Sequence, residues 1–203
     1  MRARLPRLQL PTKLVLMSSS LDVRVASVLG PLCAASERGY IGEPVSQLEH
    51  ALQCAFLARR AGASGAEVLA GLLHDIGHLV GGDDAPQMAG LGVLEHEMIG
   101  ARFLAELGVI PRVCSLVGGH VAAKRYLARR KPGYRGALSE ASRGTLAFQG
   151  GPMSAAEACA FEADPACAAK LRLRMWDEAA KRPDLDVPGL TSYVALLRDH
   201  MEP

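Results

Sequence analysis

Apolar residues recur at helical spacing along nearly the whole chain, and segments with the alternating pattern of strands are scarce. Helix boundaries are marked by Ser-x-x-Glu capping boxes at Ser64 and Ser154, by Pro111 at a helix start and by Gly108 at a helix end. The pattern predicts an all-α fold. The predicted helices begin at Pro44 (to about Gly62), Ser64 (to Gly81), about Val93 (to Leu107), Pro111 (past His120), Ser154, Asp164 (past Asp177) and about Leu190 (to His200), and residues Gly144 to Met153 are predicted to be a loop.

The 203 residues have the length and the 49% hydrophobic content of one soluble globular domain. We expect residues 17–203 to form this domain and residues 1–16 to be a disordered or spurious extension, because Met17 could be the true start. A net charge of +2 argues against a general nucleic-acid binder. No apolar run reaches the ~18 residues that span a bilayer, and the start lacks a secretory signal. We therefore expect a cytoplasmic protein without a membrane or nucleic-acid partner.

The five cysteines form no Cys-x-x-Cys pair, and their number is odd. Cys54 and Cys114 lie in apolar helical segments and are expected to be small core residues. This distribution gives no disulfide framework and fits a reducing compartment.

Two histidines flank an aspartate in the segment from Leu72 to His78. In an α-helix His74, Asp75 and His78 would project within an arc of about 100° from apolar surroundings. Burial of imidazoles with a carboxylate is costly unless something pairs them, and a bound cation does so. The alternative for this segment alone is a helix-capping or salt-bridged His–Asp pair.

Further candidate ligands lie on other predicted helices. Four of them would complete one metal site, and a second ion that shares Asp75 as a bridge would use His96 and His120. Imidazole and carboxylate ligands suit iron, zinc and similar ions without choosing among them. Any one of these histidines alone is more often an ordinary core or surface residue. The full candidate set is His50, His74, Asp75, His96, His120 and Asp177.

Cationic side chains share helix faces with two of these ligands. Lys124 follows His120 by four residues, and Arg174 precedes Asp177 by three. A metal site lined by two cations and by hydroxyl groups suits an oxyanion, most simply a phosphoryl or phosphonyl group. Alternatively, both cations are ordinary surface charges. The other polar residues expected at this site are His78, Ser142 and Thr145.

The order His50, His74-Asp75, Asp177 resembles the HD-domain superfamily, a helical metal-binding fold whose members are mostly phosphohydrolases. Further segments are similar to the HD-domain di-iron oxygenases of phosphonate catabolism. This resemblance runs from about Leu29 to the C-terminus and implies an HD-domain helical bundle. The segments are Tyr40-Ile41-Gly42-Glu43, Gln47-Leu48-Glu49-His50, Gly119 to Tyr126, Gln149 to Met153 and Trp176-Asp177-Glu178.

The resemblance implies a mixed-valence Fe(II)/Fe(III) pair that uses O2 to cleave the C–P bond of 2-amino-1-hydroxyethylphosphonate into glycine and phosphate. Asp75 would bridge the two irons, and the second iron, held by His96 and His120, would take the substrate. The first iron would be held by His50, His74, Asp75 and Asp177. The implied phosphonate-binding residues are His78, Lys124, Ser142, Thr145 and Arg174.

Tyr40 and Glu43 match a lid that occupies the second iron at rest and swings away when substrate enters. Together with His78 they are the expected catalytic residues, and Glu43 would then face the substrate amine. Its carboxylate can accept a charge-assisted hydrogen bond from a primary ammonium, whereas a trimethylammonium group has no N–H to donate and favours a more aromatic pocket.

Three other functions fit parts of this pattern. An oxygenase that acts on the trimethylammonio analogue and releases glycine betaine could share every motif. A metal-dependent HD phosphohydrolase could use the same ligands with a metal-bound water as nucleophile. A degenerate HD module that binds without catalysis would lack ligands, and none is missing here. The oligomeric state is not predicted.

Overall fold

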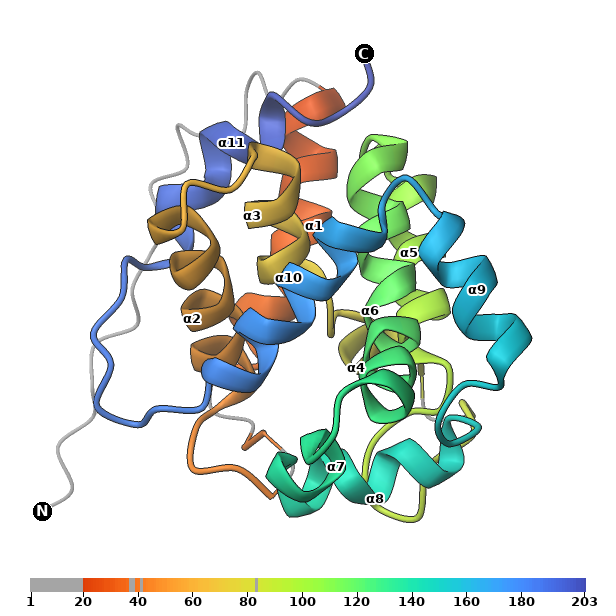
Figure 1. Ribbon diagram of the computed structural model, residues 1–203. Coiled ribbons are helices and arrows are strands. Elements are labelled where there is room, and N and C mark those ends of the chain that lie inside the picture. The colour runs from red at the N-terminus through yellow and green to blue at the C-terminus, as the bar shows by residue number, and fades with distance from the viewer. Residues whose placement is uncertain (1–19, 37–38, 41, 83) are drawn as a thin grey trace, which may run out of the picture.

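The computed structural model describes residues 20–36, 39–40, 42–82 and 84–203. These residues form eleven α-helices and one short 3₁₀ helix, with three isolated β-bridges (Figure 1). The prediction of an all-α fold is confirmed. Residues 1–16, Met17 and Ile41 lie outside the described residues. The helices are α1 (Ser20–Ala34), α2 (Gln47–Arg60), α3 (Gly65–Leu73), α4 (Gly77–Val80), α5 (His96–Glu106), α6 (Pro111–Arg130), α7 (Tyr134–Ala137), α8 (Glu140–Phe148), α9 (Ala155–Ala163), α10 (Cys167–Ala179), the 3₁₀ helix η2 (Leu190–Tyr193) and α11 (Val194–Arg198).

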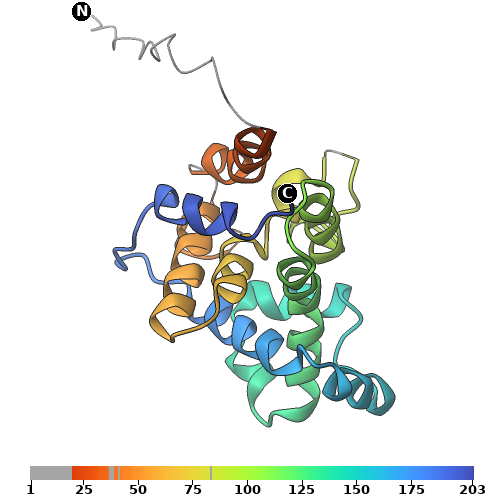
Figure 2. The same cartoon turned by 90° about the horizontal axis from the view of Figure 1, so that it is seen from above.

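Helices α2 and α3 form one hairpin, α5 and α6 form a second, and α10 packs against both (Figure 1). At one end α1 lies beside α11, as the view from above shows (Figure 2). The main core contains fully buried leucines from several of these helices, including Leu69, Leu116, Leu173 and Leu197. The packed hairpins hold α3, α6 and α10 close together, and these are elements from which site residues project.

Two predicted helix starts are each three residues too early. α2 begins at Gln47 because Ser46 and Glu49 form a capping box there, so Pro44 precedes the helix. α5 begins at His96 instead of Val93 because Glu95 adopts a left-handed conformation with φ 57°. This conformation is uncommon for a residue other than glycine, and it stops regular helix from extending backwards.

The capping box of Ser64 and Glu67 is confirmed, but the helix it starts ends at Leu73. His74 is the C-cap, and residues 74–76 form a turn before α4. The prediction of one continuous helix from Ser64 to Gly81 is therefore wrong. Gly77 explains the close approach after this turn, because a Cβ there would lie 1.9 Å from the carbonyl oxygen of His96.

The segment predicted as a loop from Gly144 to Met153 is helical in its first half, since α8 extends to Phe148, and residues 149–153 lie outside any helix as predicted. The N-cap of α8 is Ser139, whose side chain accepts a hydrogen bond from the backbone N–H of Ser142. A glycine inside a helix costs only about 1 kcal/mol. Here Gly144 also makes room for Leu91, because a Cβ would lie 2.6 Å from its Cδ1 atom.

Other predicted features are confirmed with small shifts. Pro111 is the first residue of α6, and the capping box at Ser154 starts α9. The Asp164 carboxylate accepts a hydrogen bond from the N–H of Ala166, as a helix-capping side chain would. The helix α10 itself begins at Cys167, three residues after the predicted start at Asp164. The final helix begins as the 3₁₀ turn η2.

Cys54 and Cys114 are buried, and the cysteines of the described residues are free. None of the described helices combines the length and the hydropathy needed to cross a bilayer.

Candidate metal centre

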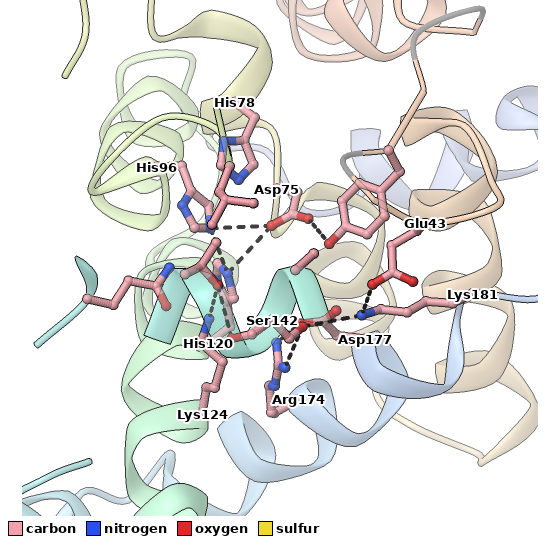
Figure 3. Close-up of a pocket in the computed structure, with 15 residues that line it drawn as sticks. Glu43, Asp75, His78, His96, His120, Lys124, Ser142, Arg174, Asp177 and Lys181 are labelled. Atoms are coloured by element: carbon pink, nitrogen blue, oxygen red, sulfur yellow. Dashed lines mark hydrogen bonds and ion pairs between the residues drawn. The ribbon is translucent and has the colours of Figure 1, made fainter. Parts of the chain in front are cut away.

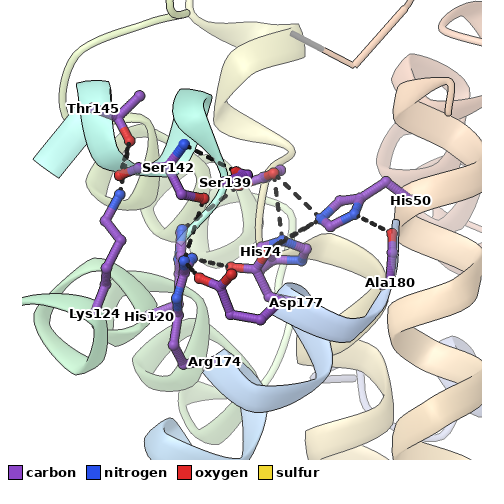
Figure 4. Close-up of polar contacts among 12 residues, drawn as sticks. His50, His74, His120, Lys124, Ser139, Ser142, Thr145, Arg174, Asp177 and Ala180 are labelled. Carbon is purple, nitrogen blue, oxygen red and sulfur yellow. Dashed lines mark hydrogen bonds and ion pairs between the residues drawn. The ribbon is translucent and has the colours of Figure 1, made fainter. Parts of the chain in front are cut away.

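The six candidate ligands converge at the centre of the bundle (Figures 3 and 4). They come from elements far apart in the sequence, and five of them are almost completely buried, whereas Asp75 is partly exposed. The contributions are His50 from α2, His74 and Asp75 from the turn after α3, His96 from the start of α5, His120 from α6 and Asp177 from α10.

One pair of histidines lies at the inner end of the cluster. The Nε2 atoms of His50 and His74 are 3.1 Å apart. Asp177 Oδ1 lies 3.4 Å from the Nε2 atom of His50 and 3.8 Å from that of His74. Asp75 Oδ2 lies 3.8 and 3.4 Å from the same two nitrogens. Two imidazoles and two carboxylate oxygens therefore surround one point.

The second pair of histidines faces the other oxygen of the same aspartate. The Nε2 atoms of His96 and His120 are 3.0 Å apart. Asp75 Oδ1 lies 3.4 Å from His96 and 3.6 Å from His120 (Figure 3). Asp75 therefore lies between the two pairs, with one oxygen toward each, as a bridging carboxylate would.

The hydrogen bonds of the four rings show that a cation fits between the members of each pair. Each Nδ1 atom lies close to a backbone carbonyl oxygen: Ala180 for His50 (2.7 Å), Gly71 for His74 (2.9 Å), Val93 for His96 (3.3 Å) and Val117 for His120 (2.8 Å). A carbonyl only accepts, so each Nδ1 donates to it, and each Nε2 that carries no proton presents a lone pair. Two facing lone pairs repel unless a cation or a proton lies between them.

The distances fit this arrangement. Two nitrogens that each lie about 2.1 Å from one metal ion, at right angles, are about 3.0 Å apart. Asp177 Oδ1 is buried and has no hydrogen-bond partner within the described part of the chain. Such an orphaned carboxylate oxygen is costly unless a cation pairs with it. Both half-sites therefore have the donors and the spacing of a metal centre.

The electrostatics of the cluster point the same way. Burial alone would raise the pKa values of Asp75 and Asp177, but His74 and Arg174, respectively, hold them well below the usual range. Burial would lower the pKa of His74, yet the neighbouring Asp75 carboxylate raises it well above its usual value. The carboxylates are therefore ionised, and a proton is drawn to the position where a metal would otherwise balance their charge.

A cavity of about 50 Å³ borders the second histidine pair, and cationic residues form its opposite wall. Lys124 donates to Thr145 Oγ1 over 2.8 Å (Figure 4). Burial, and then the nearby Arg174, lower the pKa of Lys124 to about 7. Arg174 Nη2 lies 3.4 Å from Ser142 Oγ. The four wall residues that the sequence predicted, Lys124, Ser142, Thr145 and Arg174, are thus brought together on one side of the cavity.

Arg174 is held by several partners at once. Its guanidinium donates to Asp177 Oδ2, forms an ion pair with Glu178 and donates from Nε to the hydroxyl of Tyr134 over 3.0 Å. It joins the metal cluster to the cavity wall and is fixed in place by these contacts.

His78 lines the same cavity as a neutral ring. Its ring stacks on His96 with 3.9 Å between centroids, and its Nδ1 atom accepts from the backbone N–H of Val93 over 3.0 Å. Burial, and then His96, lower its pKa to about 3. With Nδ1 accepting, the proton of the neutral ring resides on Nε2, which makes His78 a donor.

Tyr40 and Glu43 both line the cavity. The Tyr40 hydroxyl donates to Asp75 Oδ2 over 2.9 Å, and its ring stacks on His50. Burial, followed by the charge of Asp75, raises the pKa of Tyr40 well above its usual value, so the hydroxyl keeps its proton. The oxygen it contacts is the one facing the first histidine pair. The implied lid over the second iron stays a prediction.

Sequence reasoning missed Lys181 and Gln149, which also line the cavity. Lys181 pairs with Glu43 at 2.7 Å, and it follows Asp177 by four residues, which is the spacing that identified Lys124. Gln149 follows α8 directly, within the motif Gln149 to Met153, and its Oε1 atom is buried without a hydrogen-bond partner among the described residues.

Comparison with known proteins identifies the family. The model of the HD domain matches residues 48–164. The 1-hydroxy-2-(trimethylamino)ethylphosphonate dioxygenase (glycine-betaine-forming) of Leisingera caerulea is 39% identical over 160 residues, which cover 78% of this chain and 81% of the relative. The hydroxymethylphosphonate dioxygenase of Gimesia maris is 40% identical over 157 residues, which cover 77% and 78%. The chain therefore belongs to the HD-domain family and, within it, to the group of enzymes that holds these phosphonate dioxygenases.

Proposed function

We propose that this enzyme uses O2 and a di-iron centre to cleave the C–P bond of a small 1-hydroxyphosphonate. The observation that carries the proposal is the arrangement of two facing histidine pairs around the two oxygens of Asp75, opposite a cationic wall. The similarity to two named phosphonate dioxygenases supports this reaction over others of the HD-domain family.

In this proposal the ligands divide between two irons. His50, His74 and Asp177 would hold the first iron with Asp75 Oδ2, and His96 and His120 would hold the second with Asp75 Oδ1. When bound, the irons supply the activation of O2 and the electrophilic contact with the substrate hydroxyl. The second half-site has fewer protein ligands and borders the cavity, so it has room for substrate.

The protein side chains bind and orient the phosphonate. Lys124 and Arg174 supply positive charge, and Ser142 and Thr145 supply hydroxyl donors. The Nε2–H of His78 can donate to a substrate oxygen, since its low pKa keeps the ring neutral. These groups would place the C1 carbon next to the second iron.

Three substrates fit this reaction and differ in the group attached to C1. We propose 2-amino-1-hydroxyethylphosphonate, which yields glycine and phosphate, because Glu43 lines the cavity and can pair with a primary ammonium. The trimethylammonio analogue and hydroxymethylphosphonate are the alternatives, and these correspond to the names of the two relatives.

The test begins with anaerobic purification, metal analysis and EPR spectroscopy. The three hydroxyphosphonates and a phosphomonoester are then incubated with and without O2, and phosphate release is measured with product identification. We expect two irons per chain, a signal from a coupled Fe(II)/Fe(III) pair and phosphate release only from a hydroxyphosphonate under O2. Anaerobic hydrolysis of the phosphomonoester, or full activity with a single zinc, would indicate a phosphohydrolase instead.

A further inference from the structure

Lys181 forms a nearly buried ion pair at the edge of the cavity. Its Nζ atom lies 2.7 Å from Glu43 Oε1, and the two side chains are only 11% and 8% exposed (Figure 3). Neither the capping pattern nor the helix packing requires this pair, since Lys181 follows the end of α10 and Glu43 precedes α2. Both residues line the same cavity as the cationic wall.

The ammonium of Lys181 has three N–H donors, and the structure provides three oxygens for them. Besides Glu43 Oε1, Nζ lies 3.0 Å from Ser139 Oγ and 3.3 Å from Ser142 Oγ. Ser142 Oγ also lies 3.4 Å from Arg174 Nη2. The Ser142 hydroxyl therefore lies between two cations, one of which the proposed function already assigns to the phosphonate.

The two cations differ in how freely they can change partner. Arg174 contacts Asp177, Glu178 and Tyr134, and it is buried among them. Among the described residues Lys181 pairs with a single carboxylate, that of Glu43, which belongs to a short connecting segment before α2 instead of a packed helix. Lys181 can therefore exchange its carboxylate for another anion without disturbing the bundle.

Charge balance favours such an exchange when an anion enters. Among the described residues, three basic side chains (Lys124, Arg174, Lys181) and three carboxylates (Glu43, Asp75, Asp177) line the cavity. A phosphonate bound beside Ser142 adds up to two negative charges next to Glu43, and like charges at contact distance in a poorly solvated site repel strongly. Movement of Glu43 away from Lys181 relieves that repulsion and leaves the ammonium to the phosphonate.

We propose that Lys181 is a further substrate-binding residue and that Glu43 is its resident anion, which the substrate phosphonate displaces. The inference rests on the proposed function only in placing the phosphonate beside Ser142 and Arg174. It assigns Glu43 two successive partners: Lys181 in the free enzyme and, once released, the ammonium of an aminated substrate. Loss of the Glu43 charge should then have opposite effects on a simple anion and on an aminated substrate.

The experiment measures the Kd of inorganic phosphate by calorimetry on the metal-loaded enzyme, without O2 and without turnover. Lys181→Met should raise Kd by about 10-fold or more, the loss of one charge-assisted hydrogen bond. Glu43→Gln should lower Kd several-fold, because the competing anion is gone. In the double variant, which combines Lys181→Met with Glu43→Gln, the loss of the Glu43 charge should not lower Kd in this way. Arg182→Gln, which alters the exposed neighbour of Lys181, is the matched control and should leave Kd unchanged.

Lys181→Arg keeps the positive charge and should bind phosphate with nearly the affinity of the unmodified enzyme. If Lys181→Met folds poorly, this second variant still distinguishes a binding role of Lys181 from a packing role. A Glu43→Gln variant that binds phosphate no more tightly, or a folded Lys181→Met variant with unchanged Kd, would overturn the inference. Phosphate binding does not depend on oxygenase activity, so a failure of the proposed function leaves this result readable. With an aminated hydroxyphosphonate, Glu43→Gln should instead raise KM.

Discussion

The two halves of the metal centre differ in how completely the protein surrounds them. The first half has His50, His74, Asp177 and one oxygen of Asp75 around it. The second has His96, His120 and the other oxygen of Asp75, and it borders the cavity. One aspartate can therefore serve two unequal half-sites: a closed half that would surround an ion with protein ligands, and an open half with positions left for other ligands.

Removal of Asp75, the group that both halves share, should have the strongest effect. Asp75→Ala should reduce activity by roughly 100-fold or more. It should also reduce the amount of bound metal at both positions, because each half loses an oxygen ligand. Metal content by mass spectrometry and phosphate release by a colorimetric assay measure the two effects. Retention of two tightly bound ions in this variant would contradict the bridging role.

Single-histidine variants act on one half of the metal centre at a time. His120→Ala should leave the first ion in place and lose the second, so that metal content falls toward one ion per chain. His50→Ala should instead lower the affinity of the first half-site for its ion, although three other ligand atoms remain there. Both variants should be nearly inactive, and EPR spectra should show loss of the coupled pair. Equal loss of both ions in both variants would show that the halves are not independent.

A weaker effect is expected at the cavity wall beside the open half. Because burial and Arg174 lower the pKa of Lys124 to about 7, this lysine loses its proton as pH rises through that value. An anion binds the charged form, so phosphate binding should weaken between about pH 6 and 8.5 beyond the effect of the anion's own ionisation. Lys124→Met should bind about 10-fold more weakly at the lower pH and lack this extra pH dependence.

Titration of the unmodified enzyme and of Lys124→Met at the same series of pH values separates the two contributions. Metal content should stay near normal in the variant, because Lys124 donates to Thr145 and is four residues from the nearest ligand. The same pH dependence in both proteins would show that Lys124 is not the titrating group.

The sequence correctly predicted those helix starts that are determined by interactions within one turn. The capping boxes at Ser64 and Ser154 and the proline at Pro111 marked true helix starts, because each satisfies backbone groups within one turn. The turn at residues 74–76 was missed because its cause is a tertiary contact, the approach of Gly77 to His96. The first half of the predicted loop is helical because Gly144 is accommodated inside α8, where the side chain of Leu91 occupies the space beside it.

The candidate site shows the same limit. Helical spacing from a ligand identified Lys124 and Arg174, since both lie on regular helix with the ligand they accompany. Lys181 has a similar spacing from Asp177 but lies beyond the end of α10, so its direction depends on Glu43 and Ser139, which are distant in sequence. Its contribution therefore became visible only with the fold.

The carbonyl contacts of the histidine rings bear on how the protein assembles. His74, His96 and His120 each contact the carbonyl of the residue three positions earlier, so their orientation is available as soon as a local turn forms. His50 instead contacts Ala180, 130 positions away. A newly synthesised chain can therefore present three oriented imidazoles before its C-terminal third is complete. Capture of an ion by the first half would then require α2 to have packed against the C-terminal end of α10.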